Sequence, residues 1–406
     1  MTAMPSTQAP STSTASASGP TCRALIVDDS AVLRRILTKT LESDPEIEVV
    51  QAVGDGQEAI DAVSKEDIDV VVLDVEMPKM DGLTALPKIL EASPGVQVLM
   101  ASKLTLKGAE ISVNALSAGA ADYLAKPSAD GSGMSLTEFN REIRSKVKAL
   151  GGSARSMKRR KGVGAAGRPS SPIASKDPAG AGAARPSAAS SSDFTLRSPP
   201  LVFRPKILAI GSSTGGPQAL IQLLTEIARY TIDVPIVITQ HMPPMFTKIL
   251  AQQISTKCGL EASEAEDGSV LKAGSCYVAP GGKHMLINEN AGQFSVSLSD
   301  GPPVHFCKPA VDPMLNSLVT AVGGKHILTA ILTGMGADGR DGGRVVVDQG
   351  GVLLAQDEET SVVWGMPGAV ATAGLCHAVL PIEKIGGEIA KFARWSPGRQ
   401  PMRSTA

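Results

Sequence analysis

A long stretch without apolar periodicity divides this chain of 406 residues into two parts. From Gly151 to about Pro200 the sequence is dominated by glycine, alanine, serine and proline, as in "GRPSSPIASKDPAGAGAARPSAASSSD". Such a composition cannot bury enough apolar surface to offset the loss of chain entropy. We therefore expect two folded domains, at residues 23–145 and 201–390, joined by a flexible linker over residues 146–200.

Composition narrows the class of protein further. Residues 1–22 lack the basic and apolar segments of a secretion signal, so we expect a disordered tail there, and another at residues 391–406. The five cysteines are scattered without a C-x-x-C pair, which argues against a disulfide framework or a zinc site and fits the cytoplasm. A net charge of -1 gives no general attraction to nucleic acid, and no apolar run could span a bilayer. The basic run at residues 158–161 is expected to be a solvated cluster rather than a nucleic-acid patch.

Five short apolar runs, which we expect to be strands, punctuate the first domain at residues 24–29, 47–53, 69–75, 96–102 and 121–127. Segments of helical period separate them, and Ser30 is a plausible N-cap for the first. Apolar strands alternating with helices are typical of a parallel sheet covered on both faces. Pro87 falls where one helix should run, so that helix either begins late or kinks.

Polar side chains gather at the expected carboxyl ends of these strands. Asp28 and Asp29 end the first strand, and Asp74 nearly ends the third. Three clustered carboxylates repel one another unless a hard cation such as Mg²⁺ neutralises them. Ser102 and Lys126 end the fourth and fifth strands, where they could offer a hydroxyl and a positive charge to a phosphoryl group. A single aspartate at a strand end is more often a helix cap or a loop residue, but five matching positions are a much stronger signal.

The blocks "VDDS", "LDVEMPKMDG", "LMAS" and "YLAKP" resemble those of the response-regulator receiver family, which has a flavodoxin-like, five-stranded parallel sheet. The resemblance implies that a histidine kinase of a chemotaxis system phosphorylates Asp74. It implies a Mg²⁺ site made by three carboxylates, those of Asp28, Asp29 and Asp74. It also implies three residues that respond to the phosphoryl group: the switch residues Ser102 and Tyr123, and Lys126, which contacts it.

After Pro205 the same alternation of apolar runs and helices returns, so we expect a second, doubly wound α/β domain. Its first strand ends in "GSSTGGP", whose glycines fit neither a dinucleotide-binding loop nor a P-loop. The turn does contain G-x-S-x-G, the pattern that exposes a nucleophilic serine, Ser213, between a strand and a helix. A serine needs a base and the base needs an acid: His241 ends the next strand, and Asp338 follows a later one.

Other residues compete for these roles. We expect the remaining four histidines to lie on the surface or in packing positions; they are His284, His305, His326 and His377. The competing acids are Asp312 and Asp341, and Asp312 is expected first as the N-cap of the helix "PMLNSLVTAV".

The motifs "IGSSTGGPQAL", "ITQHMPP", "YVAPGGKHM", "LTGMGADG" and "WGMPGAV" resemble the catalytic domain of the chemotaxis protein-glutamate methylesterase (CheB) family, over residues 206 to about 385. The resemblance implies that Ser213 is the nucleophile, His241 the base and Asp338 the orienting acid, with no cofactor. It implies methylated chemoreceptors as substrates, deamidation of receptor glutamine as a second activity, and an active site covered by the unphosphorylated receiver domain.

Two other classes of function compete with an esterase. A phosphorylation-dependent binding module would release no methanol. A DNA-binding response regulator would carry a small, basic helical output domain, whereas residues 201–390 are rich in expected strands and not notably basic.

Overall fold

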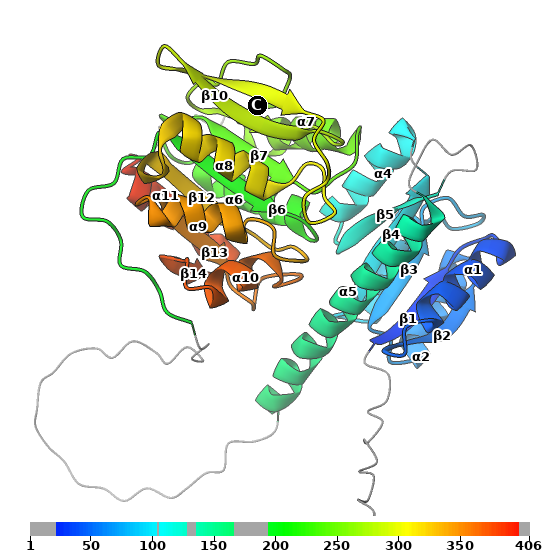
Figure 1. Cartoon of the computed structure of the whole chain (residues 1–406). Coiled ribbons are helices and arrows are strands. Elements are labelled where there is room, and N and C mark those ends of the chain that lie inside the picture. The colour runs from blue at the N-terminus through cyan, green and yellow to red at the C-terminus, as the bar shows by residue number, and fades with distance from the viewer. Residues whose placement is uncertain (1–21, 104, 128–134, 166–193, 398–406) are drawn as a thin grey trace, which may run out of the picture.

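The computed structural model describes residues 22–103, 105–127, 135–165 and 194–397 (Figure 1). In the first unit, five parallel strands form one sheet, in the order β2 (Ile47–Val53), β1 (Cys22–Val27), β3 (Val70–Asp74), β4 (Gln97–Lys103) and β5 (Asp122–Lys126). Five helices alternate with these strands: α1 (Ala31–Glu42), α2 (Gly56–Lys65), α3 (Gly82–Ala92), α4 (Leu106–Ser117) and α5 (Leu136–Ala165). The expected receiver fold is confirmed.

The helix ends of the first unit follow from local sequence. The Ser30 hydroxyl accepts a hydrogen bond from the amide of Leu33, so the predicted cap of α1 is confirmed. Asp81 caps α3, which begins at Gly82 and contains Pro87 in its interior. A late start of this helix was therefore the wrong alternative.

Helix α5 extends well past the predicted boundary of the linker. Val147, Leu150 and Ala154 recur on one face of the helix and are buried against the sheet. Arg155 and Lys158 continue the contact, because both bond to the buried carboxylate of Asp69, at 2.7 and 2.9 Å. The linker prediction is therefore wrong for residues 146–165, which belong to α5, and apolar and basic side chains as far as Lys158 have partners on the receiver.

The other predicted boundaries also move. The segment before the second sheet packs on it: the Arg197 amide donates to the carbonyl of Cys376 at 2.8 Å. Near the C-terminus, α11 (Ile382–Ala393) passes the predicted domain end, and Trp395 is buried with its ring nitrogen 2.6 Å from Asp233. The rest of the predicted linker, residues 166–193, and the predicted tails at 1–21 and 398–406 lie outside the described residues.

The second unit is built on seven parallel strands, in the order β14 (Ala378–Leu380), β13 (Val352–Gln356), β12 (Ile327–Ile331), β6 (Ile207–Ser212), β7 (Ile236–Gln240), β9 (Ser275–Val278) and β8 (Glu261–Glu264). Six helices accompany the sheet: α6 (Gly216–Ile227), α7 (Phe246–Cys258), α8 (Val311–Val322), α9 (Arg340–Asp348), α10 (Met366–Thr372) and α11. A short 3-10 helix, η1 (Gly324–His326), precedes β12. The expected α/β domain is confirmed.

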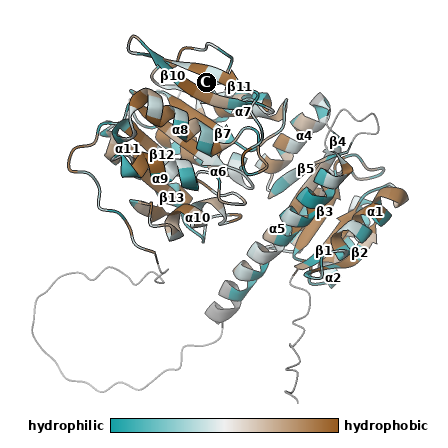
Figure 2. Cartoon of the chain, in the orientation of Figure 1, coloured by the Kyte–Doolittle hydropathy of each residue, from teal (hydrophilic) through white to brown (hydrophobic). Residues whose placement is uncertain are grey.

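Some elements of the second unit were not expected from the sequence. Strands β10 (His284–Asn290) and β11 (Gln293–Ser299) form a separate antiparallel hairpin, and β8 and β14 are the short outer strands of the large sheet. Strands β8, β10 and β11 are more than half polar and β14 has only three residues, whereas Figure 2 shows hydrophobic residues concentrated in the central strands. Among the described residues, no helix combines the length and apolar character needed to cross a bilayer.

The two units contact each other through α4 and β5 of the receiver and α6 and α7 of the second unit (Figure 1). The ring of Tyr123 stacks on Phe246, with ring centroids 4.5 Å apart. Around it, Gln253 on α7 bonds to Asn114 at 3.1 Å and to Ser117 at 3.2 Å, both on α4. The receiver therefore packs on the helices that follow β6 and β7.

Candidate functional site

Three adjacent central strands of the second sheet, β12, β6 and β7, end beside the candidate catalytic residues. Ser213 follows β6, His241 follows β7, and Asp338 lies in the loop between β12 and α9. Strand β6 lies between β7, the next strand along the chain, and β12, which comes much later in the sequence. Such a reversal of strand order opens a crevice at the carboxyl edge of a parallel sheet, which is where ligands bind in this architecture.

The turn that carries Ser213 is shaped by Gly215. This residue has a φ of 75°, and a Cβ atom there would lie 2.5 Å from Val362, so only glycine fits. The backbone of Ser213 is held on two sides: its amide donates to the carbonyl of Thr333 at 3.0 Å, and its carbonyl accepts from Gln240 at 2.9 Å. Its side chain stays partly exposed on a rigid turn.

His241 and Asp338 form a buried acid–imidazole pair, with Nε2 and Oδ2 2.8 Å apart. The Asp338 carboxylate also accepts from three backbone amides, those of Val311, Asp312 and Gly339, at 2.6 to 3.0 Å. Burial acts to raise the pKa of Asp338, but His241, together with the backbone amides of Val311 and Asp312, outweighs it and holds the pKa below its ordinary value. Asp338 is therefore an ionised acid fixed in orientation.

The environment of His241 favours the protonated imidazole. Burial opposes protonation, but Cys307 and Asp338, which both lie within hydrogen-bonding reach of the ring, raise its pKa to about 10. Among the described residues, no hydrogen bond joins the Ser213 hydroxyl to His241. Only the neutral imidazole can accept a proton from a serine, so the groups around His241 set the pH range in which it can act as a base.

The competing residues have other partners. His284 is buried between the Pro302 carbonyl and the Ala310 amide, and His377 accepts from the Leu353 amide. The N-cap of α8 is Ala310, so the prediction that Asp312 caps this helix is wrong. Asp312 lies in the first turn and instead accepts from amides at the start of α9, where no side chain of α9 supplies a cap.

The receiver residues expected at the phosphorylation site lie together. One carboxylate oxygen each of Asp28, Asp29 and Asp74 lies within 4.8 Å of the others. The Lys126 ammonium is 2.7 Å from both Asp28 and Asp74. Burial raises the pKa of Asp74, and Lys126 acts in the opposite direction. A group of oxygen ligands with excess negative charge fits Mg²⁺, which prefers carboxylate and water ligands.

The side chains of the two expected switch residues have partners outside this acidic group. The Ser102 hydroxyl bonds to Ser112 on α4 at 2.8 Å, and burial raises the pKa of Tyr123, whose ring stacks on Phe246. Sequence reasoning missed Ser112, because its position in the helical pattern is that of an ordinary buried residue.

The receiver also bonds directly to the turn that carries Ser213. Thr214 donates its hydroxyl to the Asp122 carboxylate at 2.6 Å, and the Gly215 amide donates to the Ala121 carbonyl at 3.1 Å. Gln218, on the next turn of α6, donates to the Ala120 carbonyl at 2.8 Å. No sequence signal identified these contacts, since each partner comes from a different unit.

Comparison with known proteins gives matches to both units. The family model for CheB methylesterase matches residues 208–389, and the model for the response regulator receiver domain matches residues 24–136. A protein-glutamate methylesterase/protein-glutamine glutaminase of Azospirillum brasilense is 51% identical over 387 residues, covering 94% of this chain and 95% of that protein. A protein-glutamate methylesterase/protein-glutamine glutaminase of the group 2 operon of Rhodospirillum centenum is 51% identical over 378 residues, covering 91% of this chain and 94% of that protein. The solved Thermotoga maritima CheB methylesterase catalytic domain is 38% identical, with a TM-score of 0.45, and covers 46% of this chain and 98% of that one.

Proposed function

We propose, because this chain belongs to the protein-glutamate methylesterase/protein-glutamine glutaminase family, that it hydrolyses glutamate γ-methyl esters on chemoreceptors and so serves sensory adaptation in chemotaxis. The same active site would deamidate receptor glutamine, since an amide presents the same carbonyl group. The substrates would be the cytoplasmic helices of the receptors, which places the enzyme in the cytoplasm.

In the proposed reaction, Ser213 Oγ attacks the ester carbonyl carbon while His241 takes its proton. The C–O bond to the methoxy group then breaks, and methanol leaves with the proton from His241. Water, activated by the same imidazole, attacks the acyl-enzyme and releases glutamate and Ser213. Amides at the start of α6, such as that of Gly215, are suited to hold the developing oxyanion. Asp338 keeps the imidazole oriented throughout.

The observation that carries this proposal is the His241–Asp338 pair at 2.8 Å beside the Ser213 turn, at the edge formed by β12, β6 and β7. Each of the three roles comes from the end of a different, adjacent strand. Serine, imidazole and backbone amides supply the nucleophile, base and oxyanion donors for acyl transfer at this edge, and the Asp338 carboxylate orients the base.

Regulation by the receiver follows from the contacts of its α4 and β5. With Mg²⁺ bound by Asp28, Asp29 and Asp74, the cation would offset the charge of an incoming phosphoryl group at Asp74. A phosphorylated Asp74 would draw the Ser102 hydroxyl away from Ser112, its partner on α4. Because α4 and β5 hold α7 and the Ser213 turn, their displacement would expose the active site.

The direct test is methanol release from membranes carrying methylated chemoreceptors. The intact protein should release methanol slowly, and faster when a small-molecule phosphodonor and Mg²⁺ are present. A chain that binds these membranes under both conditions but releases no methanol would be a binding module, and the hydrolase proposal would fail.

Replacing Asp74 with asparagine should remove the stimulation by phosphodonor and leave the basal rate of methanol release unchanged. The amide cannot form the acyl phosphate, while its size preserves the fold of the receiver. Rates with and without phosphodonor, together with incorporation of labelled phosphate, measure this effect. The Asp81→Asn variant, which alters an exposed cap of α3 near the same strand end, is the matched control and should keep its stimulation.

The pKa of His241 gives a prediction for the pH dependence. Since Cys307 acts to raise that pKa, the Cys307→Ala variant should lower it. The His241 imidazole would then stay neutral to lower pH. The acidic limb of the pH profile, where kcat/KM rises as His241 loses its proton, should therefore move to lower pH by roughly one unit. A pH profile of methanol release measures the shift. The Cys258→Ala variant alters a buried thiol on α7 and should leave the limb in place; an unmoved limb in both variants would contradict the role of Cys307.

A further inference from the structure

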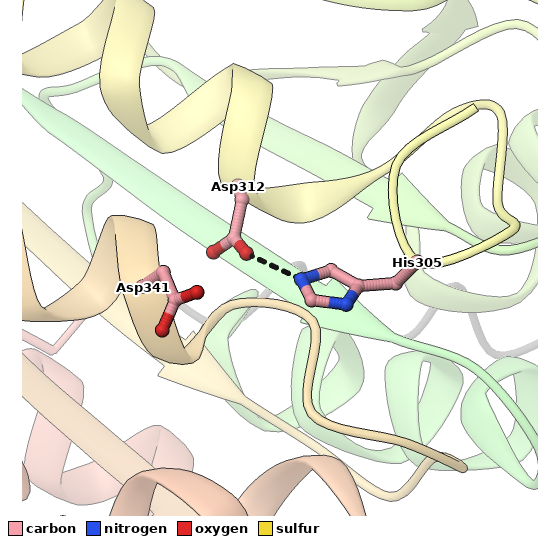
Figure 3. Close-up of side chains that lie close together, drawn as sticks. All are labelled: His305, Asp312 and Asp341. Atoms are coloured by element: carbon pink, nitrogen blue, oxygen red, sulfur yellow. Dashed lines mark hydrogen bonds and ion pairs between the residues drawn. The ribbon is translucent and has the colours of Figure 1, made fainter. Parts of the chain in front are cut away.

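A second acid–imidazole pair lies next to the catalytic pair. His305 Nε2 is 3.0 Å from Asp312 Oδ2, as Figure 3 shows. Asp312 is buried in the first turn of α8, whereas the His305 side chain is 37% exposed on the loop that precedes this helix. Asp341, the third side chain in Figure 3, comes from α9 and bonds to Arg340 at 2.9 Å. The hydrolysis mechanism above does not use this second pair.

The two pairs are joined through one backbone amide. The amide of Gly339 lies 3.0 Å from Asp338 Oδ1 and 3.0 Å from Asp312 Oδ1, so it is shared between the two carboxylates. In addition, the backbone amide of Asp312 donates to Asp338 Oδ1 at 3.0 Å. Gly339 has a φ of 88° and directly follows Asp338, so whatever fixes this glycine also fixes the backbone of the catalytic acid.

Placing a second carboxylate here has an electrostatic consequence. Two ionised carboxylates that share a donor in a buried site repel each other, and burial together with Asp338 raises the pKa of Asp312. Each carboxylate has its own imidazole, His241 for Asp338 and His305 for Asp312. His305 contacts Asp312 as His241 contacts Asp338, so a positive charge on the His305 imidazole would offset the charge that Asp312 imposes on the catalytic pair.

We propose that Asp312 and His305 are positioning residues of the esterase: Asp312 fixes Gly339 and thereby Asp338, and His305 balances its charge, so that the pair sets the pH range in which His241 acts as base. This inference rests on the proposed hydrolase function and concerns its pH dependence.

Several other charged groups surround His305 and must be considered in any titration. They are Asp312 on α8, the α9 residues Arg340, Asp341 and Arg344, the catalytic Asp338 and His241, the adjacent Cys307, and Arg141 of the receiver, which lies 4.0 Å from the Phe306 ring. Arg340 and Asp341 pair with each other in solvent, so they contribute little net charge.

The test compares two full-length variants in the presence of phosphodonor, with kcat/KM for methanol release measured against pH. The Asp312→Asn variant keeps an acceptor for Gly339 but removes a negative charge, so the acidic limb should move to lower pH. The His305→Gln variant removes the balancing positive charge, so the limb should move to higher pH. Each shift should be about half a pH unit or more, and KM should change little. Asp341→Asn, which removes an exposed charge nearby, is the control and should shift the limb least.

Opposite shifts are the result that a merely structural role would not produce. Equal losses of activity at all pH values, with no displacement of the limb, would overturn the proposal, and so would shifts of the same sign. If Asp312→Asn does not fold, the His305→Gln variant still decides the matter, because its side chain is partly exposed on a loop.

A second measurement separates this proposal from the esterase assignment. The chain has five histidines, so the His241 imidazole can be followed by NMR in labelled protein that carries Ser213→Ala, with His241→Gln used for assignment. The titration midpoint of His241 should fall with Asp312→Asn and rise with His305→Gln, whether or not the wild-type chain releases methanol. An unmoved midpoint would overturn the positioning role alone.

Discussion

Replacement of Ser213 by alanine should lower methanol release from methylated receptors by about 10⁴-fold or more, which is the typical cost of losing a member of a serine hydrolase triad. The physical reason is that the neighbouring hydroxyls on this turn, those of Ser212 and Thr214, are buried and already bonded to Gln240 and Asp122, so they cannot replace the Ser213 hydroxyl. The loss should appear in kcat, with and without phosphodonor, because the variant still binds receptor and still accepts phosphate at Asp74. Methanol release and receptor binding, measured on the same preparation, check both parts.

The neighbouring serine supplies the matched control. The Ser212 hydroxyl is buried and bonds to Gln240 at 2.6 Å, so it is unavailable to a substrate. Ser212→Ala should therefore retain activity within about tenfold of wild type, as expected for the loss of one buried hydrogen bond. A Ser213→Ala protein that folds and still demethylates receptors at close to the wild-type rate would end the triad assignment.

Replacement of Asp122 by alanine should have the second largest effect, and in the opposite direction. The Thr214 hydroxyl donates to the Asp122 carboxylate at 2.6 Å across the interface between the two units. Hydrogen bonds to charged groups contribute about 1.5 to 3 kcal/mol, which corresponds to roughly 10- to 100-fold in the equilibrium between closed and open forms. The basal rate of methanol release without phosphodonor should rise by up to that factor, and stimulation by phosphodonor should shrink accordingly.

Asp44 offers a control for the loss of an aspartate–lysine pair in the receiver. Asp122 bonds to Lys146 on α5 at 2.9 Å, and Asp44 bonds to Lys148 on the same helix at 3.2 Å, but only Asp122 contacts the second unit. Asp44→Ala should leave the basal rate unchanged. Equal basal rates in wild type, Asp122→Ala and a fragment beginning at Phe194 would show that the receiver does not inhibit the esterase.

The strands of the first sheet and the central strands of the second could be predicted because their signal is local. Runs such as "ILAIGS" and "VVVLD" are buried on both faces, and only a strand between two layers of helices accepts continuous apolar residues. The candidate site followed from the same pattern, since parallel strands bring their carboxyl ends to one edge. Ser213, His241 and Asp338 could therefore be grouped before any coordinates were known.

The extent of α5 and the role of Asp312 could not be predicted in this way. Residues 151–165 have the small and basic composition of a linker, and they become helix because Ala154, Arg155 and Lys158 contact distant residues of the receiver. Asp312 precedes a proline and a helical pattern, which favoured an N-cap, yet its carboxylate bonds to amides of α9. Contacts between residues far apart along the chain produce no periodic pattern in the sequence, so these two features could not be detected from it.

The sequence by itself determined two α/β units, the acidic group with Lys126 in the first, and the serine, histidine and aspartate at one edge of the second. Only the tertiary structure decided that the receiver holds the Ser213 turn through Asp122 and Ala121, and that a second carboxylate with its own imidazole partner, Asp312 with His305, lies beside Asp338. The physical reason is the range of the interactions. Burial and backbone hydrogen bonding impose a repeat of a few residues, whereas a single hydrogen bond or charge pair between distant segments depends on where the whole fold places two side chains.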